Sequence, residues 1–236
     1  LFKDKEFKFF FNKQNLFLLL VILILSTYLS INLKLGWDAQ NYWILRYINF
    51  KNELGIENIS NLTRPDYPFL GSYIWTVFSE TSFLKFEYLG RIYFIYLFCI
   101  ALRKLVDLTE LNLNEKNLIF FFLIIISFNK NLINGYQEIL VFSFLVFLSY
   151  FIYILIKDKF DLNIFILSIL TINLLFWLKN EAMFFALIMS FILLFFLSPK
   201  KIVILIICIF TLIVTRYFVY KYFNLEFNLQ SGNYDR

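Results

Sequence analysis

The sequence predicts an all-α, polytopic membrane protein, and three observations predict it. Of the 236 residues, 61% are hydrophobic and 22% are aromatic, whereas the apolar share of a soluble domain lies near about 45–50%. The mean hydropathy is +0.72. Apolar runs of helical length recur along the chain, and short charged breaks such as "IKDKFD" and "LSPKK" separate them.

About seven apolar segments are predicted to be transmembrane helices. They cover residues 16–33, 88–106, 117–128, 138–156, 162–178, 182–197 and 201–219. Several are shorter than the ~20 residues that a span needs, but the charged breaks favour separate spans over fewer long helices. The first segment follows a charged stretch and has no small-residue cleavage site, so we expect a retained anchor.

The first outer loop, residues 34–87, is predicted to contain interfacial helices. Its segment 69–84, "FLGSYIWTVFSETSFL", is short and carries Glu80. If this segment spanned the membrane, the later basic loops would face outwards, against the positive-inside rule. We therefore expect an interfacial or re-entrant helix.

The whole chain, 1–236, is interpreted as a single transmembrane domain. Residues 1–15 form a cytoplasmic tail, and residues 220–236 begin an outer segment. The absent initiator Met and the polar end "SGNYDR" predict a fragment of a longer protein.

This topology gathers unusual polar residues at the outer ends of the helices, namely Asp38, Asp66, Glu138, Lys179 and Glu181. A carboxylate near hydrocarbon is costly and usually faces a cavity or a partner. The alternative for each is a solvated loop charge. For Asp38, a helix N-cap is a further alternative. Other basic residues of the outer loop would suit an anion; they include Arg46, Lys51 and Arg64.

Two prolines, Pro65 and Pro68, lie shortly before the interfacial segment. Proline fixes φ and disfavours helix in the residue before it. Residues 64–67 are therefore expected to form an extended, rigid elbow that orients Arg64, Asp66 and Tyr67. The alternative is a plain helix-starting turn.

The cysteines, the net charge and the glycine content mainly exclude other classes of protein. Cys99 and Cys208 lie in apolar runs and are predicted to be buried free thiols. The net charge of +5 fits basic cytoplasmic loops, and no nucleic-acid signal is present. With only 6 Gly in the chain and no Gly-rich phosphate loop, no nucleotide-binding domain is expected.

Five segments in order carry a resemblance: "GWDAQNYWILR", "RPDYPFLGSYIW", "EYLGRIYFIYLFCIALRKLV", "NGYQEILVFSFLVF" and "LKNEAMFFALIMSFILLFF". Together they resemble the GT-C glycosyltransferases, which include the dolichyl-phosphate-mannose mannosyltransferase-like (family 39-like) and aminoarabinose transferase-like bacterial proteins. The resemblance implies a core of seven transmembrane helices with interfacial helices in the first outer loop. It also implies transfer of a sugar from a polyprenyl-phosphate-linked donor to a lipid, glycan or protein acceptor. The active site would face the periplasm or exterior of a bacterial inner membrane.

The resemblance also implies the site. The family's catalytic acidic residue falls on Asp38, and its proline signature on residues 65–68. The substrate-binding positions implied are Asp66, Tyr67, Arg91, Tyr136, Glu138, Lys179 and Glu181. Glu138 stands where Asp is commoner, and Ala182 replaces a Gly. The first departure puts a metal-binding role of Glu138 in doubt, so no cofactor is certain and a divalent metal ion stays open.

The chemistry of an inverting transfer asks for these residue types. A carboxylate, here Asp38, removes the proton of the acceptor hydroxyl as it attacks. Cations, here Lys179 and Arg91, stabilise the leaving lipid phosphate. Glu138 and Glu181 would contact sugar, acceptor or metal. Three aromatic residues could stack on sugar or lipid, although aromatic belts at the membrane interface are the commoner explanation; they are Tyr67, Tyr136 and Trp43.

Two other classes remain open. A transporter or channel subunit would show charges in mid-helix and repeated halves, whereas the middles of these helices are nearly free of charge and no repeat is found. An O-antigen polymerase or ligase also handles lipid-linked glycans, and it would rely on outer-loop arginines. The glycosyltransferase interpretation requires the distant carboxylates and cations to converge in one water-accessible place at the outer rim of the bilayer.

Overall fold

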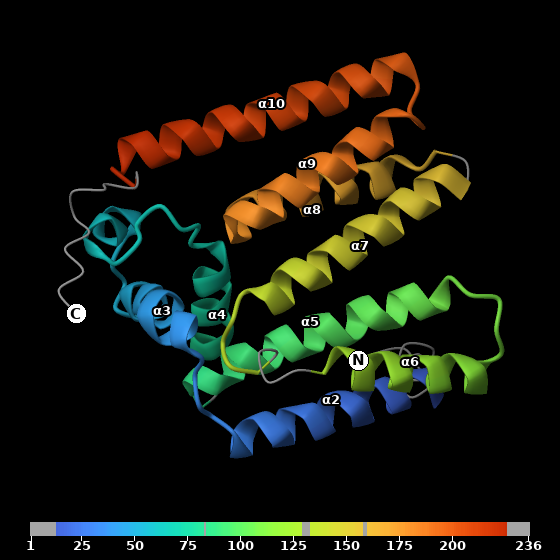
Figure 1. Ribbon diagram of the computed structural model, residues 1–236, viewed down its shortest axis with the longest axis horizontal. Coiled ribbons are helices and arrows are strands. Elements are labelled where there is room, and N and C mark those ends of the chain that lie inside the picture. The colour runs from blue at the N-terminus through green and yellow to red at the C-terminus, as the bar shows by residue number, and fades with distance from the viewer. Residues whose placement is uncertain (1–12, 83, 129–132, 158–159, 226–236) are drawn as a thin grey trace, which may run out of the picture.

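All the secondary structure that the computed structural model describes is helical, which confirms the predicted all-α class (Figure 1). The structure describes residues 13–82, 84–128, 133–157 and 160–225. The elements are α2 (Lys13–Ile31), the π-helix η1 (Ala39–Trp43), α3 (Ile44–Lys51), the 3-10 helix η2 (Ile56–Asn61), α4 (Leu70–Glu80), α5 (Glu87–Asp107), α6 (Leu113–Ser127), α7 (Glu138–Lys157), α8 (Leu162–Leu178), α9 (Asn180–Leu194) and α10 (Pro199–Tyr222).

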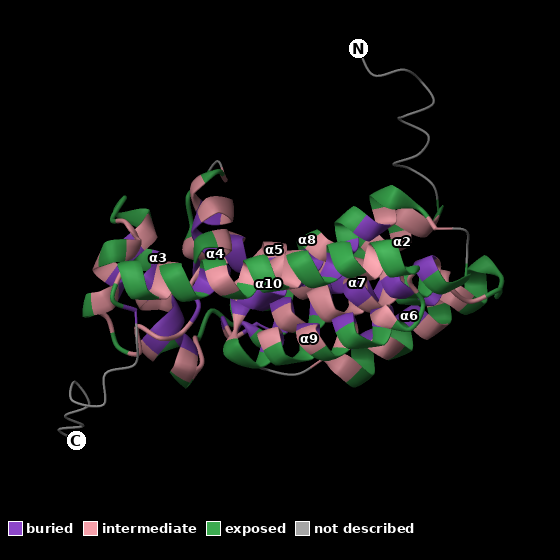
Figure 2. Cartoon of the chain, turned by 90° about the horizontal axis from the view of Figure 1, so that it is seen from above, coloured by how far each residue is buried: buried purple, intermediate pink, exposed green. Residues whose placement is uncertain are grey.

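The long helices lie side by side and run back and forth along one direction. In Figure 1 they pass from α2 and α6 through α5 and α7 to α8, α9 and α10. The short elements from η1 to α4 gather at one end of this bundle, as Figure 2 also shows from above. We call this end the α3–α4 end. It receives the end of α2, the start of α7, the junction of α8 with α9 and the end of α10.

Helix α5 packs against α2, α4, α6 and α7 and forms the middle of the core. Phe94, Phe98 and Leu102 recur every four residues and are all buried, so they form one continuous stripe on this helix. Near its start, a Cβ added at Gly90 would lie 2.4 Å from the backbone oxygen of Trp75 in α4. Only a residue without a side chain allows α4 and α5 to approach so closely.

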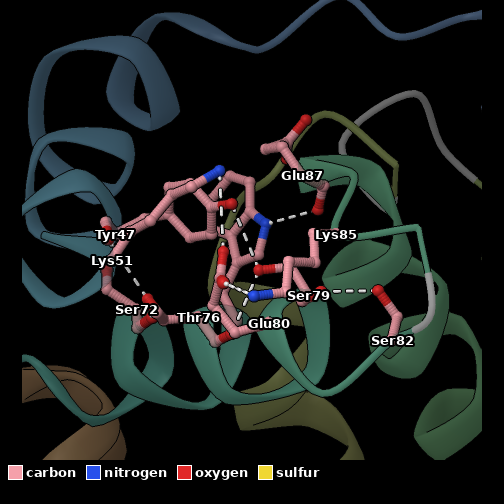
Figure 3. Close-up of polar contacts among 10 residues, drawn as sticks. Tyr47, Lys51, Ser72, Thr76, Ser79, Glu80, Ser82, Lys85 and Glu87 are labelled. Atoms are coloured by element: carbon pink, nitrogen blue, oxygen red, sulfur yellow. Dashed lines mark hydrogen bonds and ion pairs between the residues drawn. The ribbon is translucent and has the colours of Figure 1, made fainter.

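Three hydroxyl side chains of α4 hold it against η1 and α3 (Figure 3). Ser72 donates to the carbonyl of Trp43 at 2.9 Å, and Thr76 donates to the carbonyl of Tyr47 at 3.2 Å. Ser79 donates to the phenol oxygen of Tyr47 at 3.1 Å. The spacing of four and three residues places all three on one face of α4. The segment between α2 and α5 is therefore built as a packed unit of α3 and α4.

The prediction of seven membrane spans is wrong, judged by the length and composition of the helices. In the described part of the chain, three helices are long and apolar enough to cross a membrane, namely α2, α7 and α10. The apolar helices α8 and α9 have 17 and 15 residues, so they extend only about 25 and 22 Å against a hydrocarbon core of about 30 Å. Helix α6 also has 15 residues. Helix α5 is longer but carries charged residues at both ends, including Arg91 and Arg103.

Both cysteines are free thiols. Cys99 is buried in the core, as predicted, whereas Cys208 is only half-buried. The difference arises because α10 has just two buried residues, Leu205 and Arg216, and leaves most of its apolar surface uncovered.

Candidate functional site

Two segments that are far apart in the sequence meet at the α3–α4 end. The backbone N–H of Gly36 donates to the carbonyl of Asn134 at 2.9 Å. The ring of Tyr136 lies so close that a Cβ added at Gly36 would be 2.6 Å from Cζ. Gly135 has a φ of +79° and a crowded Cα next to Ala39, which suits only glycine. The turn before α7 is thereby fixed against the segment that contains Asp38.

Lys179 and Glu138 form an ion pair across two helix ends. Lys179 Nζ, between α8 and α9, lies 2.6 Å from Glu138 Oε1 at the first residue of α7. Burial disfavours the charged amine, but the hydrogen bond and charge of Glu138 outweigh it and raise the pKa of Lys179 above 10.5. The charges of Glu181 and Asp38 act in the same direction. The carboxylates of Glu138, Glu181 and Asp38 therefore all act on the ammonium group of Lys179.

Asp38 is half-buried and stands at the N-cap position of the π-helix η1. Its side chain makes no capping hydrogen bond, so a capping role does not account for this residue. Within the described residues, no hydrogen bond or ion pair engages its carboxylate. π-Helices are rare and occur frequently at functional sites. Asp38 thus offers a carboxylate without a described partner, and its charge acts on the ammonium group of Lys179, which is paired with Glu138.

The predicted extended elbow at residues 64–67 is instead a tight turn. Arg64 has a φ of +56°, and Tyr67 N–H donates to Arg64 C=O at 3.0 Å, closing a β-turn with Pro65 in its favoured second position. Asp66 receives two hydrogen bonds from Arg64, both of 3.0 Å. Tyr67 stacks on Trp43 with ring centroids 5.6 Å apart. The turn therefore holds Asp66 and Tyr67 in fixed positions, as the elbow was expected to do.

Arg46 is fully buried on α3 beside this turn. Its Nη1 donates to the carbonyl of Tyr42 at 2.9 Å, and its Nη2 donates to the carbonyl of Arg64. Its Nε is buried without a hydrogen-bond partner among the residues that the structure describes. Burial lowers the pKa of Arg46 to about 10, although the nearby Tyr220 and Asp66 oppose the shift. The sequence marked Arg46 only as one of several outer basic residues.

Arg216 is a second buried arginine, and sequence reasoning missed it. From α10 its guanidinium donates to the carbonyl of Phe176 and the side-chain oxygen of Asn180, which belong to α8 and α9. Its Nη2 also lies 3.4 Å from the phenol oxygen of Tyr220. A single arginine within the apolar run "TLIVTRYFVY" was the available signal, because a charge in such a helix is costly.

Arg91 does not join the Lys179 cluster. It is 2% exposed, and it donates to the carbonyls of Ile133 at 2.8 Å and Leu33 at 3.1 Å. Glu87, one turn earlier, accepts from its Nη2 at 2.9 Å. Arg91 Nε lies 2.8 Å from the other Glu87 oxygen but off the hydrogen-bonding direction, so that contact is ionic. Arg91 ties together the end of α2, the start of α5 and the turn before α7.

Gln137 is another residue that sequence reasoning did not select. It is fully buried between Tyr136 and Glu138, and neither amide atom has a hydrogen-bond partner within the described ranges. Its Oε1 lies so close to α4 that a Cβ added at Gly71 would be 1.7 Å away. The side chain therefore wedges the turn before α7 against the start of α4.

The geometry does not provide a metal centre in the described ranges, where no group of three or more His, Cys, Asp and Glu side chains is placed to hold an ion. The charges of Asp38, Glu138 and Glu181 all act on Lys179, but these carboxylates do not form a set of metal ligands. Comparison of the chain with protein-family models, curated proteins and solved structures found no match. Any assignment of function therefore rests on the geometry of the site.

Proposed function

We propose that this chain is a membrane glycosyltransferase that moves a sugar from a polyprenyl-phosphate-linked donor to a lipid, glycan or protein acceptor on the non-cytoplasmic face. One observation carries the proposal. Asp38, which has no described partner, shares its electrostatic environment with the Glu138–Lys179 ion pair. Asp38 follows the end of α2, and Glu138 begins α7; both helices are of transmembrane length.

Location supports a substrate that is anchored in lipid. Helices α2, α7 and α10 each have one end at the α3–α4 end of the bundle (Figure 1). With these helices placed across the bilayer, α3 and α4 lie at its surface, and Asp38 and Lys179 lie at the level of lipid head groups. A polyprenyl phosphate would present its phosphate and sugar at that same level.

The proposed step is a single inverting displacement. The acceptor hydroxyl oxygen forms a bond to the anomeric carbon while the bond from that carbon to the phosphate oxygen breaks. Asp38 takes the hydroxyl proton as general base. The lipid phosphate leaves with the electron pair and its negative charge, which cations stabilise. Lys179 supplies one positive charge, and Glu138 and Glu181 accept hydrogen bonds from sugar hydroxyls.

The other predicted residues have supporting roles in this proposal. Tyr136, packed on Gly36, presents an aromatic ring to the sugar next to Asp38. Tyr67 and Asp66 are held in place by the β-turn and by the pair with Arg64, and they would contact the substrate. Arg91 acts by positioning the turn before α7, because its hydrogen bonds are made within the protein.

Replacement of Asp38 by Asn tests the proposal. Membranes that contain the full-length protein would be supplied with a labelled polyprenyl-phosphate sugar, and transfer to endogenous acceptor would be measured. Loss of the base predicts a fall of at least about 100-fold with unchanged protein level. The matched control is Asp161→Asn, which keeps a capping oxygen at the start of α8. Full transfer by Asp38→Asn would refute the proposed mechanism.

A further inference from the structure

Helices α8 and α9 meet at a single residue, Lys179. Helix α8 ends at Leu178 and α9 begins at Asn180; we call these three residues the α8–α9 junction. Lys179 has an extended backbone, with φ −158° and ψ 151°, and its Nζ lies 2.6 Å from Glu138 Oε1 on α7. The direction of this ammonium group therefore depends on how the two helix ends are held.

Arg216 of α10 contacts both helix ends. Its guanidinium donates to the carbonyl of Phe176, three residues before Lys179, and to the side-chain oxygen of Asn180, the next residue. Its Nη1 also lies 3.4 Å from the sulfur of Met183, in the first turn of α9. The last four carbonyls of a helix have no partner within that helix, so Arg216 satisfies one that α8 leaves open.

A ring contact supports the same junction. Tyr220, one turn after Arg216 on α10, lies against Trp177 of α8 with ring centroids 6.4 Å apart. Residues four apart share one face of a helix, so Arg216 and Tyr220 both face the end of α8. Helix α10 has just two buried residues, Leu205 and Arg216. Arg216 is thus a buried polar link between α10 and the α8–α9 junction.

The simpler interpretation is that Arg216 only packs α10 against the bundle. A leucine would pack an apolar helix without the cost of burying a charge. The groups that Arg216 contacts on α8 and α9 lie on both sides of Lys179. Both features favour a role at the junction over general packing.

We propose that Arg216 is a positioning residue, which clamps the α8–α9 junction and thereby directs the ammonium group of Lys179 towards Glu138. It acts on the site through Lys179, without contact to a substrate. The placement of α10 thus helps to set the geometry of the site. The clamp is argued from the contacts alone, whereas its effect on sugar transfer rests on the proposed function.

Cross-linking of the two helix ends tests the clamp without an assay of transfer. The full-length protein in lipid nanodiscs would carry Glu138→Cys and Lys179→Cys, with both native cysteines replaced. The measurement is the rate of intramolecular cross-linking by a short bis-maleimide. Arg216→Lys can reach only one of the two oxygen acceptors, and Arg216→Leu reaches neither. The rate should therefore fall severalfold from wild type through Lys to Leu, because a loosened junction lowers the effective concentration of one cysteine near the other.

The matched control is Arg103→Lys, which changes a buried arginine that pairs with Asp107 at the far end of the bundle. It should leave the cross-linking rate unchanged. Arg216→Leu removes a charge from an apolar helix, so insertion into the membrane is not impaired. Equal rates with Arg, Lys and Leu at position 216, or no cross-link in the parent protein, overturn the clamp. If Arg216→Leu does not fold, Arg216→Lys decides.

Transfer measurements separate the clamp from the proposed function. Arg216→Lys should lower kcat about tenfold in the wild type, because the misplaced cation no longer meets the leaving phosphate. It should lower kcat no further in Lys179→Gln, because residues that act through one another are not additive. An unchanged kcat, or an equal fall in both backgrounds, would overturn the positioning role. Slower cross-linking in the Arg216 variants combined with full transfer by Asp38→Asn would keep the clamp and reject the proposed glycosyl transfer mechanism.

Discussion

At the scale of single residues, four buried arginines serve two different purposes. Arg91 and Arg103 each have a carboxylate one helical turn away on α5, and their remaining hydrogen bonds join neighbouring elements. Arg46 and Arg216 have only neutral acceptors in the described residues. A buried arginine that is paired with a carboxylate has a structural role, because it links neighbouring elements. An arginine with only neutral acceptors keeps its buried charge at an energetic cost, and this difference is visible only when the partners are known.

The Lys179–Glu138 pair gives a residue-scale prediction. The pair is partly exposed, with side-chain exposures of 20% and 53%, so Lys179→Gln should cost less than about 1 kcal/mol of stability. Sugar transfer should fall by about 100-fold, because a cation near the leaving phosphate is lost. The measurements are Tm and transfer rate. Lys51→Gln, which removes an exposed pair with Glu80, is the control and should retain activity.

The pH dependence of this pair follows from the raised pKa of Lys179. In the unfolded chain the amine titrates near 10.5, and in the folded protein it titrates higher. The stabilisation is therefore fully present below pH 10.5 and is lost as the pH rises through the folded value. At neutral pH the wild-type Lys179 is therefore protonated. A loss of transfer in Lys179→Gln at that pH would reflect the loss of this positive charge. A wild-type transfer rate in this variant would exclude Lys179 from the chemistry.

Some site residues could be predicted from the sequence, and others could not. Asp38, Glu138 and Lys179 stood out because each is a charge next to a long apolar run. The sequence could not show that these residues lie close together, because their proximity depends on the turn that Gly135 and Arg91 fix. Gln137 could not be selected, because a polar residue in a turn is ordinary unless its amide is known to be buried and unpartnered.

At the scale of elements, the apolar runs and the charged breaks between them located the long helices well. Helix capping decided where a helix begins, and helix length decided whether it could span a membrane. The segment predicted at 162–178 has the same bounds as α8. Helix α6 begins at Leu113 instead of residue 117, because Asn112 and Glu115 form a capping box that starts the helix before its apolar run. The number of spans was overestimated, since hydropathy alone does not show that α6, α8 and α9 stop short of a full bilayer.

Arg91 gives the element-scale prediction. Replacement by Lys keeps one positive charge but cannot reach the carbonyls of Leu33 and Ile133 together with Glu87. The ends of α2 and the turn before α7 would lose their common anchor, at a cost of about 3 kcal/mol. A fall in the thermal midpoint of the purified protein is the expected measurement, and the exposed substitution Lys85→Arg should leave it unchanged. Loss of transfer with an unchanged midpoint would instead restore Arg91 to the phosphate-binding role.

At the scale of the whole molecule, the arrangement of helices places all the proposed chemistry at one end. The end of α2, the start of α7 and the end of α10 share that end with α3 and α4 (Figure 1). The opposite end carries the starts of α2, α6, α8 and α10 and the ion pair of Arg103 with Asp107. If the longest apolar helices cross a bilayer, these two ends must lie on opposite sides of it.

Cysteine labelling of intact cells tests this arrangement. In a background with Cys99→Ala and Cys208→Ser, one cysteine would replace exposed Lys34 near Asp38 and, in a second variant, exposed Lys200 at the start of α10. A membrane-impermeant maleimide should label the first variant in intact cells and the second only after permeabilisation, because the proposed site faces outwards. Labelling both variants equally from outside would mean that the two ends share one side. A lipid-anchored donor could not then meet Asp38 in the way proposed, since the helices that position the site would not span the bilayer.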